Sequence, residues 1–237
     1  MLFYLIRHGD PDYSTDSLTP LGRRQAEAVA RRLSVRGLDR IYSSPLGRAR
    51  ETAQPTAEIL RLPVEIEEWT SESLAWAELT EKDEEGKTHW IHTRLSKPET
   101  IEAERPILTM ENWADMPSVA GTGAKEGIAR IQAASDAFFA RQGYVREGVK
   151  YRVEKPNNDR IALFAHGGFG VAFLSVLLGI PPQFVLSSFE MPHCGISIFH
   201  FANNADGWTQ PRCLSYSDTS FQYEDRLPML YNNKIRI

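Results

Sequence analysis

Two runs of apolar and aromatic residues constrain the fold of this 237-residue chain more than any other feature. Residues 2–6 read LFYLI and residues 161–165 read IALFA, and polar residues follow each run. Strands that are apolar on both faces are covered on both faces, which is typical of a parallel sheet between helices. The chain is therefore expected to build an α/β fold around a buried sheet.

The segments after the first run alternate between strand and helix patterns. A threonine-proline start signal predicts a helix over about 20–35. A serine-proline start signal predicts a second helix over about 45–60, bent or broken at Pro55. Strands are expected over residues 39–43 and 64–67. This β-α-β-α-β order predicts a mostly parallel sheet with helical crossovers.

Residues 68–125 differ in character from the rest of the chain. They hold four of the five tryptophans, several acidic clusters and no clear strand pattern. We expect an insertion that packs over the sheet, within a single domain of residues 1–237. The remaining patterns predict a helix over 128–141, a hairpin or loop over 144–158, a helix over 168–178, and strands over 195–201 and 208–215.

Composition excludes several classes of protein. The chain has 27 Lys and Arg against 31 Asp and Glu, a net charge of −4, which argues against a nucleic-acid-binding surface over the whole molecule. Two cysteines, Cys194 and Cys213, favour reduced thiols over a disulfide framework. The N-terminal apolar run is too short for a signal peptide, and residues 169–178 span about half a membrane. We therefore expect a cytoplasmic protein without a membrane partner.

Polar residues that could bind or react with a substrate follow three of the predicted strands. Arg7 and His8 end the first strand, and His166 follows the strand over 161–165. Arg48 falls in the first turn of the helix that follows the second strand. Because the carboxyl ends of parallel strands form the ligand crevice of an open α/β sheet, these side chains are expected to converge.

Two arginines and two histidines in one crevice suit phosphoryl chemistry. Arginines bind phosphate through paired hydrogen bonds, and the helix starts after Ser44 and after Gly167 add backbone N–H donors. Gly167 is therefore expected among the phosphate-binding residues, with Arg7 and Arg48. One imidazole is suited to attack phosphorus and the other to donate to the phosphoryl oxygens. A carboxylic acid would still be needed to protonate the leaving alkoxide.

The sequence resembles the histidine phosphatase superfamily, in its phosphoglycerate mutase-like branch. The resemblance is carried by four motifs in family order: L-I-R-H-G at 5–9, L-T-x-x-G-x-x-Q-A at 18–26, Y-S-S-P-L-x-R-A-x-x-T at 42–52 and A-H-G-G at 165–168. It covers roughly residues 1–75 and 160–201. It implies a three-layer α/β/α sandwich with a mostly parallel central sheet and a helical insertion over the active site.

The resemblance also implies roles for individual residues. His8 matches the nucleophile that becomes phosphohistidine. Arg7, Arg48 and His166 match the rest of the phosphate pocket, with Gly167 beside it. The family's proton donor is a carboxylic acid about two dozen residues after the second arginine. Glu72 is the expected donor, with Glu68 and Glu78 as alternatives, and the reaction uses no metal and no organic cofactor.

Other polar groups carry weaker signals. His89 and His92 have helical spacing for a metal site, but they lack a third ligand, so a surface or packing role is favoured. His193-Cys194 lacks the context of a nucleophile pair, whereas the resemblance implies that His193 borders the active site. The tryptophans of 69–113 fit a substrate-recognition lid and a buried core equally well.

The motifs leave three functions to compare. A mutase of this family carries a Ser/Trp/Asn-containing stretch after RHG, and here that stretch reads DPDYS. Its absence favours a metal-independent phosphomonoesterase, and Asp10 and Asp12 would repel a second anionic group. The alternatives are a phosphoglycerate mutase-type phosphotransferase and a silent phospho-ligand-binding scaffold. We expect a small phosphorylated metabolite as substrate, and the sequence predicts neither its identity nor an oligomeric state.

Overall fold

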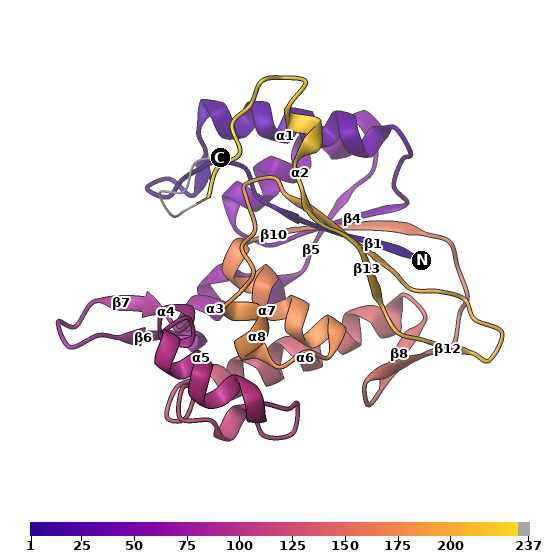
Figure 1. The fold of residues 1–237 in the computed structure, drawn as a ribbon. Helices are drawn as coiled ribbons and strands as arrows, with labels where there is room; N and C mark the ends of the chain where they lie inside the picture. The colour runs from indigo at the N-terminus through magenta and orange to yellow at the C-terminus, as the bar shows by residue number, and fades with distance from the viewer. Residues whose placement is uncertain (232–237) are drawn as a thin grey trace.

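A six-stranded sheet forms the centre of the computed structural model, which describes residues 1–231 (Figure 1). The order of its strands is β13-β11-β1-β10-β4-β5. Only β11 is antiparallel to its neighbours, and the other three pairings are parallel. The strands are β13 (Arg212–Asp218), β11 (Ile196–His200), β1 (Leu2–Arg7), β10 (Arg160–Ala165), β4 (Arg40–Ser43) and β5 (Val64–Ile66). The predicted mixed α/β fold with a mostly parallel sheet is confirmed.

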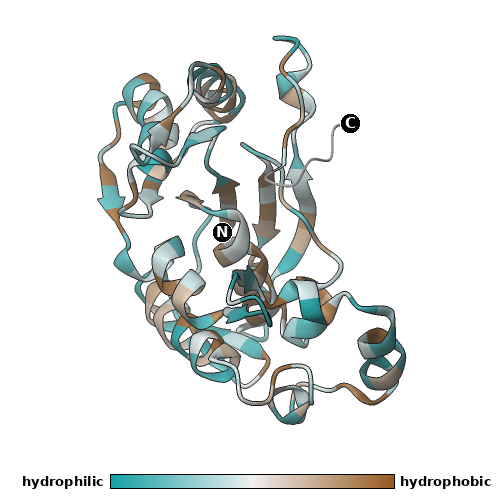
Figure 2. Ribbon diagram, turned by 90° about the vertical axis from the view of Figure 1, so that its left-hand side faces the viewer, coloured by the Kyte–Doolittle hydropathy of each residue, from teal (hydrophilic) through white to brown (hydrophobic). Residues whose placement is uncertain are grey.

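Helices cover both faces of the sheet. On one face lie α1 (Pro20–Ser34) and α2 (Gly47–Leu60), and on the other lie α6 (Ala124–Arg141) and α7 (Gly167–Leu178) (Figure 1). Hydrophobic residues concentrate on the central strands between these layers (Figure 2). This arrangement is the three-layer sandwich that the sequence predicts.

Alternation along β1 divides the core into two parts. Phe3 and Leu5 point into the cluster that contains α6 and α7, whereas Tyr4 and Ile6 point into the cluster that contains α1 and α2. All four side chains are buried, so both faces of β1 contribute to the core. A polar side chain at any of these four positions would be buried in the core. The first charged residue of the strand is Arg7, at its carboxyl end.

Of the two predictions for Pro55, a bend or a break in the second helix, the break is wrong. Helix α2 starts at Gly47 rather than at residue 45, its N-cap is Leu46, and it continues through Pro55 without a break. A proline removes one backbone hydrogen bond, but Ala53 and Ala57 on either side of it are buried. Packing of this face against α1 and the sheet compensates for the missing bond.

The expectation of no strand within residues 68–125 is also wrong. A hairpin of β6 (Thr80–Lys82) and β7 (Thr88–Trp90) projects from this region beside α3 (Glu72–Glu78) (Figure 1). Strands of three residues are too short to show an alternating pattern. The region also contains α4 (His92–Leu95), α5 (Pro98–Glu104) and the 3-10 turns Glu68–Thr70, Arg105–Ile107 and Trp113–Asp115.

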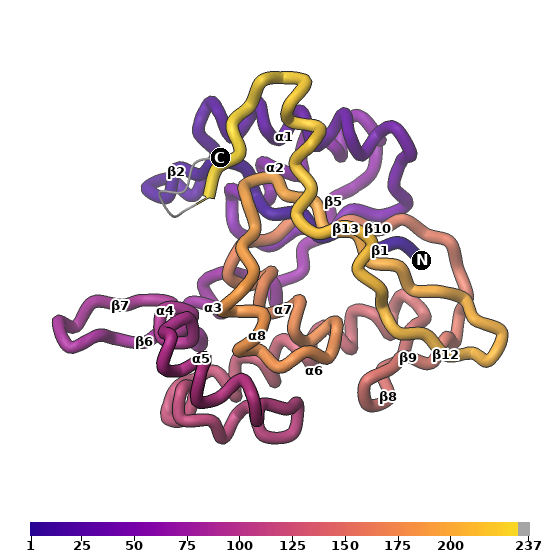
Figure 3. Tube along the Cα trace, viewed as in Figure 1, coloured from indigo at the N-terminus to yellow at the C-terminus, as the bar shows by residue number. Residues whose placement is uncertain are grey.

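Several shorter elements complete the fold. The expected hairpin over 144–158 is present as β8 (Tyr144–Glu147) and β9 (Lys150–Val153), and β12 (Trp208–Thr209) joins it. The other elements are β2 (Pro11–Asp12), β3 (Ser17–Leu18), α8 (Pro182–Leu186) and the 3-10 turn Ser220–Gln222. After β13 the chain turns back toward α1, which Figure 3 follows along the tube. Within residues 1–231, no helix is long and apolar enough to span a membrane.

The division into one domain with an insertion over 68–125 stays a prediction. Residues 232–237 of the predicted domain lie outside the described part of the chain. Both cysteines are free, Cys194 buried and Cys213 exposed, as expected for thiols without a bridge.

Candidate active site

His8 lies at the carboxyl end of β1 and is almost completely buried. Its Nδ1 is 2.7 Å from the carbonyl oxygen of Gly9, and Arg48 Nε donates to its Nε2 at 3.4 Å. A carbonyl oxygen only accepts, so Nδ1 carries the proton and Nε2 keeps its lone pair. Burial, with the charge of Arg7, holds the pKa of His8 well below its usual value. The ring is therefore a neutral imidazole with a defined nucleophilic nitrogen.

His166 follows β10, the strand next to β1, and its ring centroid is 5.2 Å from that of His8. The side chain is fully buried, and its Nε2 is 2.7 Å from Ser44 Oγ. Burial and the charge of Arg48 hold the pKa of His166 well below its usual value. Within residues 1–231, its buried Nδ1 has no hydrogen-bond partner. In the tautomer in which the Ser44 hydroxyl donates to Nε2, Nδ1 carries the proton.

The two arginines also reach this crevice, Arg7 from the end of β1 and Arg48 from the start of the helix that follows β4. Arg7 is buried at the end of β1, and its Nη1 donates to the carbonyl oxygen of Met191. Burial lowers its pKa. Arg48 lies in the first turn of α2, between His8 Nε2 and the carboxylate of Asp16. The predicted convergence of strand-end residues is therefore present in the structure.

Glu72 begins α3 and reaches the first turn of α7. Its two carboxylate oxygens accept hydrogen bonds from the backbone N–H groups of Gly168 at 3.0 Å and Phe169 at 2.8 Å. Burial raises its pKa, although these hydrogen bonds and the charges of Arg7 and Arg48 oppose the shift. A buried carboxyl with a raised pKa is suited to proton donation.

The alternative acids lie elsewhere. Glu68 is an exposed residue of a 3-10 turn. Glu78 forms two 2.7 Å hydrogen bonds with Arg130 and so joins α3 to α6. Of the three carboxylates considered from the sequence, Glu72 is the one at the crevice.

Two glycines permit the close packing of this crevice. Gly167 starts α7, and a Cβ there would lie 3.1 Å from Arg7 Nε. A Cβ on Gly168 would lie 2.5 Å from Trp90 Cη2 and 3.0 Å from a Glu72 oxygen. Side chains at either position would displace the groups that surround the histidines.

The sequence interpretation missed Asp16, whose carboxylate forms an ion pair with Arg48 and accepts from the backbone of Gly47. Asp10 and Asp12, the two aspartates of this loop that it did consider, have other partners. Asp12 is bound to Ser14, while Asp10 accepts from Thr19. No sequence signal distinguishes Asp16, because it lies in a loop with a positive φ of 49° and its partners, Gly47 and Arg48, are about thirty residues further along the chain.

His193 lies in the second layer of the crevice. It is buried, its ring centroid is 5.8 Å from that of His8, and its Nδ1 is 3.5 Å from Asp10 Oδ1. This position agrees with the expectation that it borders the site. Burial raises the pKa of the neighbouring Cys194 thiol, which opposes a role as a thiolate nucleophile.

The two histidines of the insertion lie on different elements. His89 lies in β7 and is 2.6 Å from Asp83, whereas His92 begins α4. Among residues 1–231, no three His, Cys, Asp or Glu side chains group to hold a metal ion. A strand ends between the two histidines, so they do not share a helix, and the surface or packing role favoured from the sequence stays a prediction.

The four tryptophans of the insertion take two kinds of position. Trp69 packs against Phe138, Phe169 and Phe173 of the core, and Trp113 is buried in the same cluster. Trp76 and Trp90 instead line a pocket of about 410 Å³ together with Tyr13, Arg48, Glu72 and Ser73. This pocket contains both a strand-end arginine and the carboxylate of α3.

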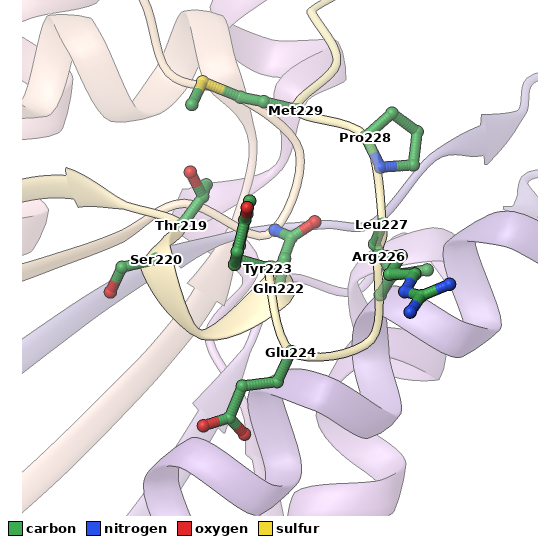
Figure 4. Close-up of a pocket in the computed structure, with 9 residues that line it drawn as sticks. All are labelled: Thr219, Ser220, Gln222, Tyr223, Glu224, Arg226, Leu227, Pro228 and Met229. Carbon is green, nitrogen blue, oxygen red and sulfur yellow. The ribbon is translucent and has the colours of Figure 1, made fainter.

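A larger hollow, of about 830 Å³, lies at the C-terminal segment. Figure 4 shows that the residues lining it all come from the folded-back stretch 219–229. None of the strand-end residues lines it. The segment instead supports the crevice from behind, because Gln222 donates to the carbonyl oxygen of His193 at 3.0 Å.

Comparison with known proteins agrees with this constellation. The family model described as "Histidine phosphatase superfamily (branch 1)" matches residues 3–212. The chain belongs to this superfamily. The expectations of the family and of an enzyme of histidine-phosphatase type are thereby confirmed.

Curated relatives of this superfamily are similar over most of their length. The chain is 26% identical to a putative phosphoserine phosphatase 2 from Hydrogenobacter thermophilus, over 83% of this chain and 88% of that protein. It is 28% identical to a probable phosphoglycerate mutase GpmB from Proteus mirabilis, over 86% of this chain and 88% of that protein.

Solved structures share the fold. A phosphoserine phosphatase from Entamoeba histolytica in complex with 3-phosphoglyceric acid matches with a TM-score of 0.59 and 21% identity, over 93% of this chain and 98% of that one. A mycobacterial glucosyl-3-phosphoglycerate phosphatase matches with a TM-score of 0.60 and 23% identity, over 92% and 99%. At these identities the similarity establishes the architecture alone.

Proposed function

We propose that this protein is a metal-independent phosphomonoesterase that works through a phosphohistidine at His8. The observation that carries the proposal is the tautomer of His8, in which Nδ1 is bound to Gly9 and Nε2 is left as a nucleophile among two arginines. A silent binding protein has no need of a neutral, oriented imidazole in this place.

In the first step, Nε2 of His8 attacks phosphorus and the bond from phosphorus to the ester oxygen breaks. The leaving alkoxide takes the proton of Glu72. Arg7, Arg48 and the Nδ1–H of His166 bind the phosphoryl oxygens, on which charge accumulates. The imidazolium that forms keeps its hydrogen bond to the Gly9 carbonyl oxygen, which stabilises the new positive charge.

In the second step, a water molecule gives its proton to the Glu72 carboxylate and attacks phosphorus. The P–N bond breaks, the electron pair returns to Nε2, and inorganic phosphate leaves. Two arginines and the start of α7 at Gly167 supply the positive electrostatic field for both steps, so the chemistry needs no metal ion.

A phosphatase fits this crevice better than a mutase does. A mutase retains a second anionic group of its substrate, and Asp16 places a carboxylate directly on Arg48. Glu72 adds a second carboxyl to the same pocket. We propose a small phosphorylated metabolite as the substrate. The two free cysteines suit a reducing, cytoplasmic location.

Rapid quenching of the protein with a radiolabelled phosphomonoester tests the proposal. We expect a phosphoenzyme that is labile in acid and stable in alkali, turnover that persists in EDTA, and loss of both in His8→Asn. Phosphoryl transfer that depends on a bisphosphate primer would establish the mutase instead. Phosphate or vanadate binding without turnover or a phosphoenzyme would establish the silent scaffold.

A further inference from the structure

The pocket of about 410 Å³ beside Arg48 and Glu72 has an aromatic lining. Besides those two residues, it is formed by Tyr13, Ser73, Trp76 and Trp90. Under the proposed function, Arg48 contacts the phosphoryl group and Glu72 the leaving oxygen. The other lining residues then contact the remainder of the leaving group.

The two indoles hold fixed positions relative to the proposed acid. Trp76 lies four residues after Glu72 on α3, so both project from the same side of the helix. Trp90 ends β7, and its ring meets that of Trp76 edge to face, with centroids 5.0 Å apart and an interplanar angle of 89°. Its six-membered ring also covers Gly168, whose N–H binds Glu72.

A third ring faces these indoles from the loop after β2. The guanidinium of Arg48 lies 5.3 Å from the centroid of the Tyr13 ring. Tyr13 is 58% exposed and Trp76 is 41% exposed, so large aromatic surfaces meet solvent at the proposed reaction centre. A ligand that covers them gains stacking and apolar burial, which contributes several-fold to tenfold in affinity for each ring.

The charges of the pocket disfavour an anionic leaving group. Of the described residues that line it, Arg48 is the cation, and its Nη1 is already paired with Asp16. Glu72 supplies a second carboxyl, and aromatic faces carry negative partial charge. A carboxylate on the leaving group would lose its hydration here without gaining an ion pair.

We propose that this pocket selects phosphomonoesters whose leaving group is an uncharged ring with a flat face. The ring lies between Tyr13 and the Trp76–Trp90 pair, and esters that carry a carboxylate next to the phosphate are poor substrates. Both aryl rings and pyranose sugars present such a face. This inference rests on the proposed phosphatase activity of the same site.

Pairs of substrates with matched leaving groups test the inference. Glucose 6-phosphate against 3-phosphoglycerate compares a ring with a carboxylate at similar alcohol basicity. Phenyl phosphate against 4-carboxyphenyl phosphate compares one ring with and without the charge. In each pair, we expect kcat/KM to be at least tenfold higher for the substrate whose leaving group is uncharged. The first pair tests a sugar ring and the second an aryl ring.

Variants separate ring contact from a general structural effect. Trp76→Ala should raise KM for substrates with an uncharged ring about tenfold, and it should lower kcat/KM for them several-fold more than for glycerol 3-phosphate, which has no ring. Trp76→Phe should restore most of the loss. Trp208→Ala is the matched control, because that indole lies in β12 under Lys150 and outside the pocket.

Each outcome has a distinct meaning. Equal or faster turnover of 3-phosphoglycerate or phosphoserine would overturn the ring preference and leave the phosphatase proposal standing. An equal loss on every substrate in Trp76→Ala would also overturn it, because the residue would then act on stability alone. Absence of both turnover and phosphoenzyme on all substrates would overturn the proposed function itself.

Discussion

The carboxylate of Asp16 holds Arg48 by an ion pair, and its second oxygen accepts a hydrogen bond of 2.7 Å from the backbone of Gly47. Asp16 therefore fixes the first turn of α2 and the guanidinium that this turn carries. Because Arg48 Nε donates to His8 Nε2, a loop residue outside the family motifs positions a group at the proposed nucleophile.

Asp16→Ala should lower kcat/KM by about ten- to a hundredfold, since a hydrogen bond to a charged group contributes about 1.5–3 kcal/mol. Asp16→Asn keeps the hydrogen bond to Gly47 and should lose less. Steady-state kinetics at constant ionic strength measures both. Asp12→Asn is the control, because Asp12 is bound to Ser14 and not to Arg48. Equal losses in the Asp12 and Asp16 variants would refute the positioning role.

Glu72→Gln should slow alkyl phosphates far more than aryl phosphates. A general acid contributes roughly 10²–10⁴-fold when the leaving group is a poor one, and less when the leaving group is stable as an anion. The comparison is kcat for glycerol 3-phosphate against p-nitrophenyl phosphate. Glu68→Gln, which alters an exposed carboxylate nearby, should change neither rate. A uniform loss on both substrates in Glu72→Gln would contradict proton donation.

The same residue sets the expected pH dependence of activity. Burial raises the pKa of Glu72, and the proposed first step needs its protonated form. Activity should therefore fall as pH rises through this pKa, which gives an alkaline limb to kcat. The limb should disappear in Glu72→Gln, and a limb that persists unchanged would assign it to another group.

The site residues that follow strands could be predicted from the sequence, whereas those in loops and short helices could not. Arg7, His8 and His166 follow continuous apolar strands, so their convergence follows from sheet geometry alone. Glu72 required the family spacing, because nothing local separates it from Glu68. In the structure, Glu72 is distinguished from Glu68 by its hydrogen bond to the backbone of α7, about a hundred residues further along the chain.

The features that the sequence did not predict lie in short strands and in a helix that contains proline. The hairpin that carries Trp90 has strands of three residues, so neither its strand periodicity nor its position over Gly168 can be read in advance. The continuity of α2 through Pro55 depends on tertiary packing, which overrides local propensity.

Acidification should destabilise the protein through its buried histidines. The folded pKa values of His8 and His166 lie well below 6.5, mainly because of burial. As pH falls below about 6.5, these two residues gain protons in the unfolded chain and not in the folded one. Each should therefore lower the free energy of unfolding by about 1.4 kcal/mol per pH unit in this window, until the folded pKa is reached.

Urea unfolding of His8→Asn, in buffers free of phosphate, tests this linkage. The variant lacks one of the two titrating groups, so about one pH unit below 6.5 the slope of the unfolding free energy against pH should be smaller by nearly one proton, about 1.4 kcal/mol per pH unit. An unchanged m-value would show that the unfolded state is comparable. The same slope in variant and parent would mean that His8 binds a proton in the folded protein, and would contradict a neutral nucleophile.

Gly168→Ala should damage both stability and turnover by displacing Trp90. The new Cβ would lie 2.5 Å from Trp90 Cη2 and 3.0 Å from Glu72, and overpacking of this kind costs about 1–3 kcal/mol. In the double variant with Trp90→Ala, the indole is gone and the added methyl group has room. We therefore expect the second substitution to offset much of the first, with a coupling of about 0.5–3 kcal/mol in unfolding and in kcat/KM. Additive effects of the two substitutions would show that the Trp90 ring does not rest on Gly168 in solution.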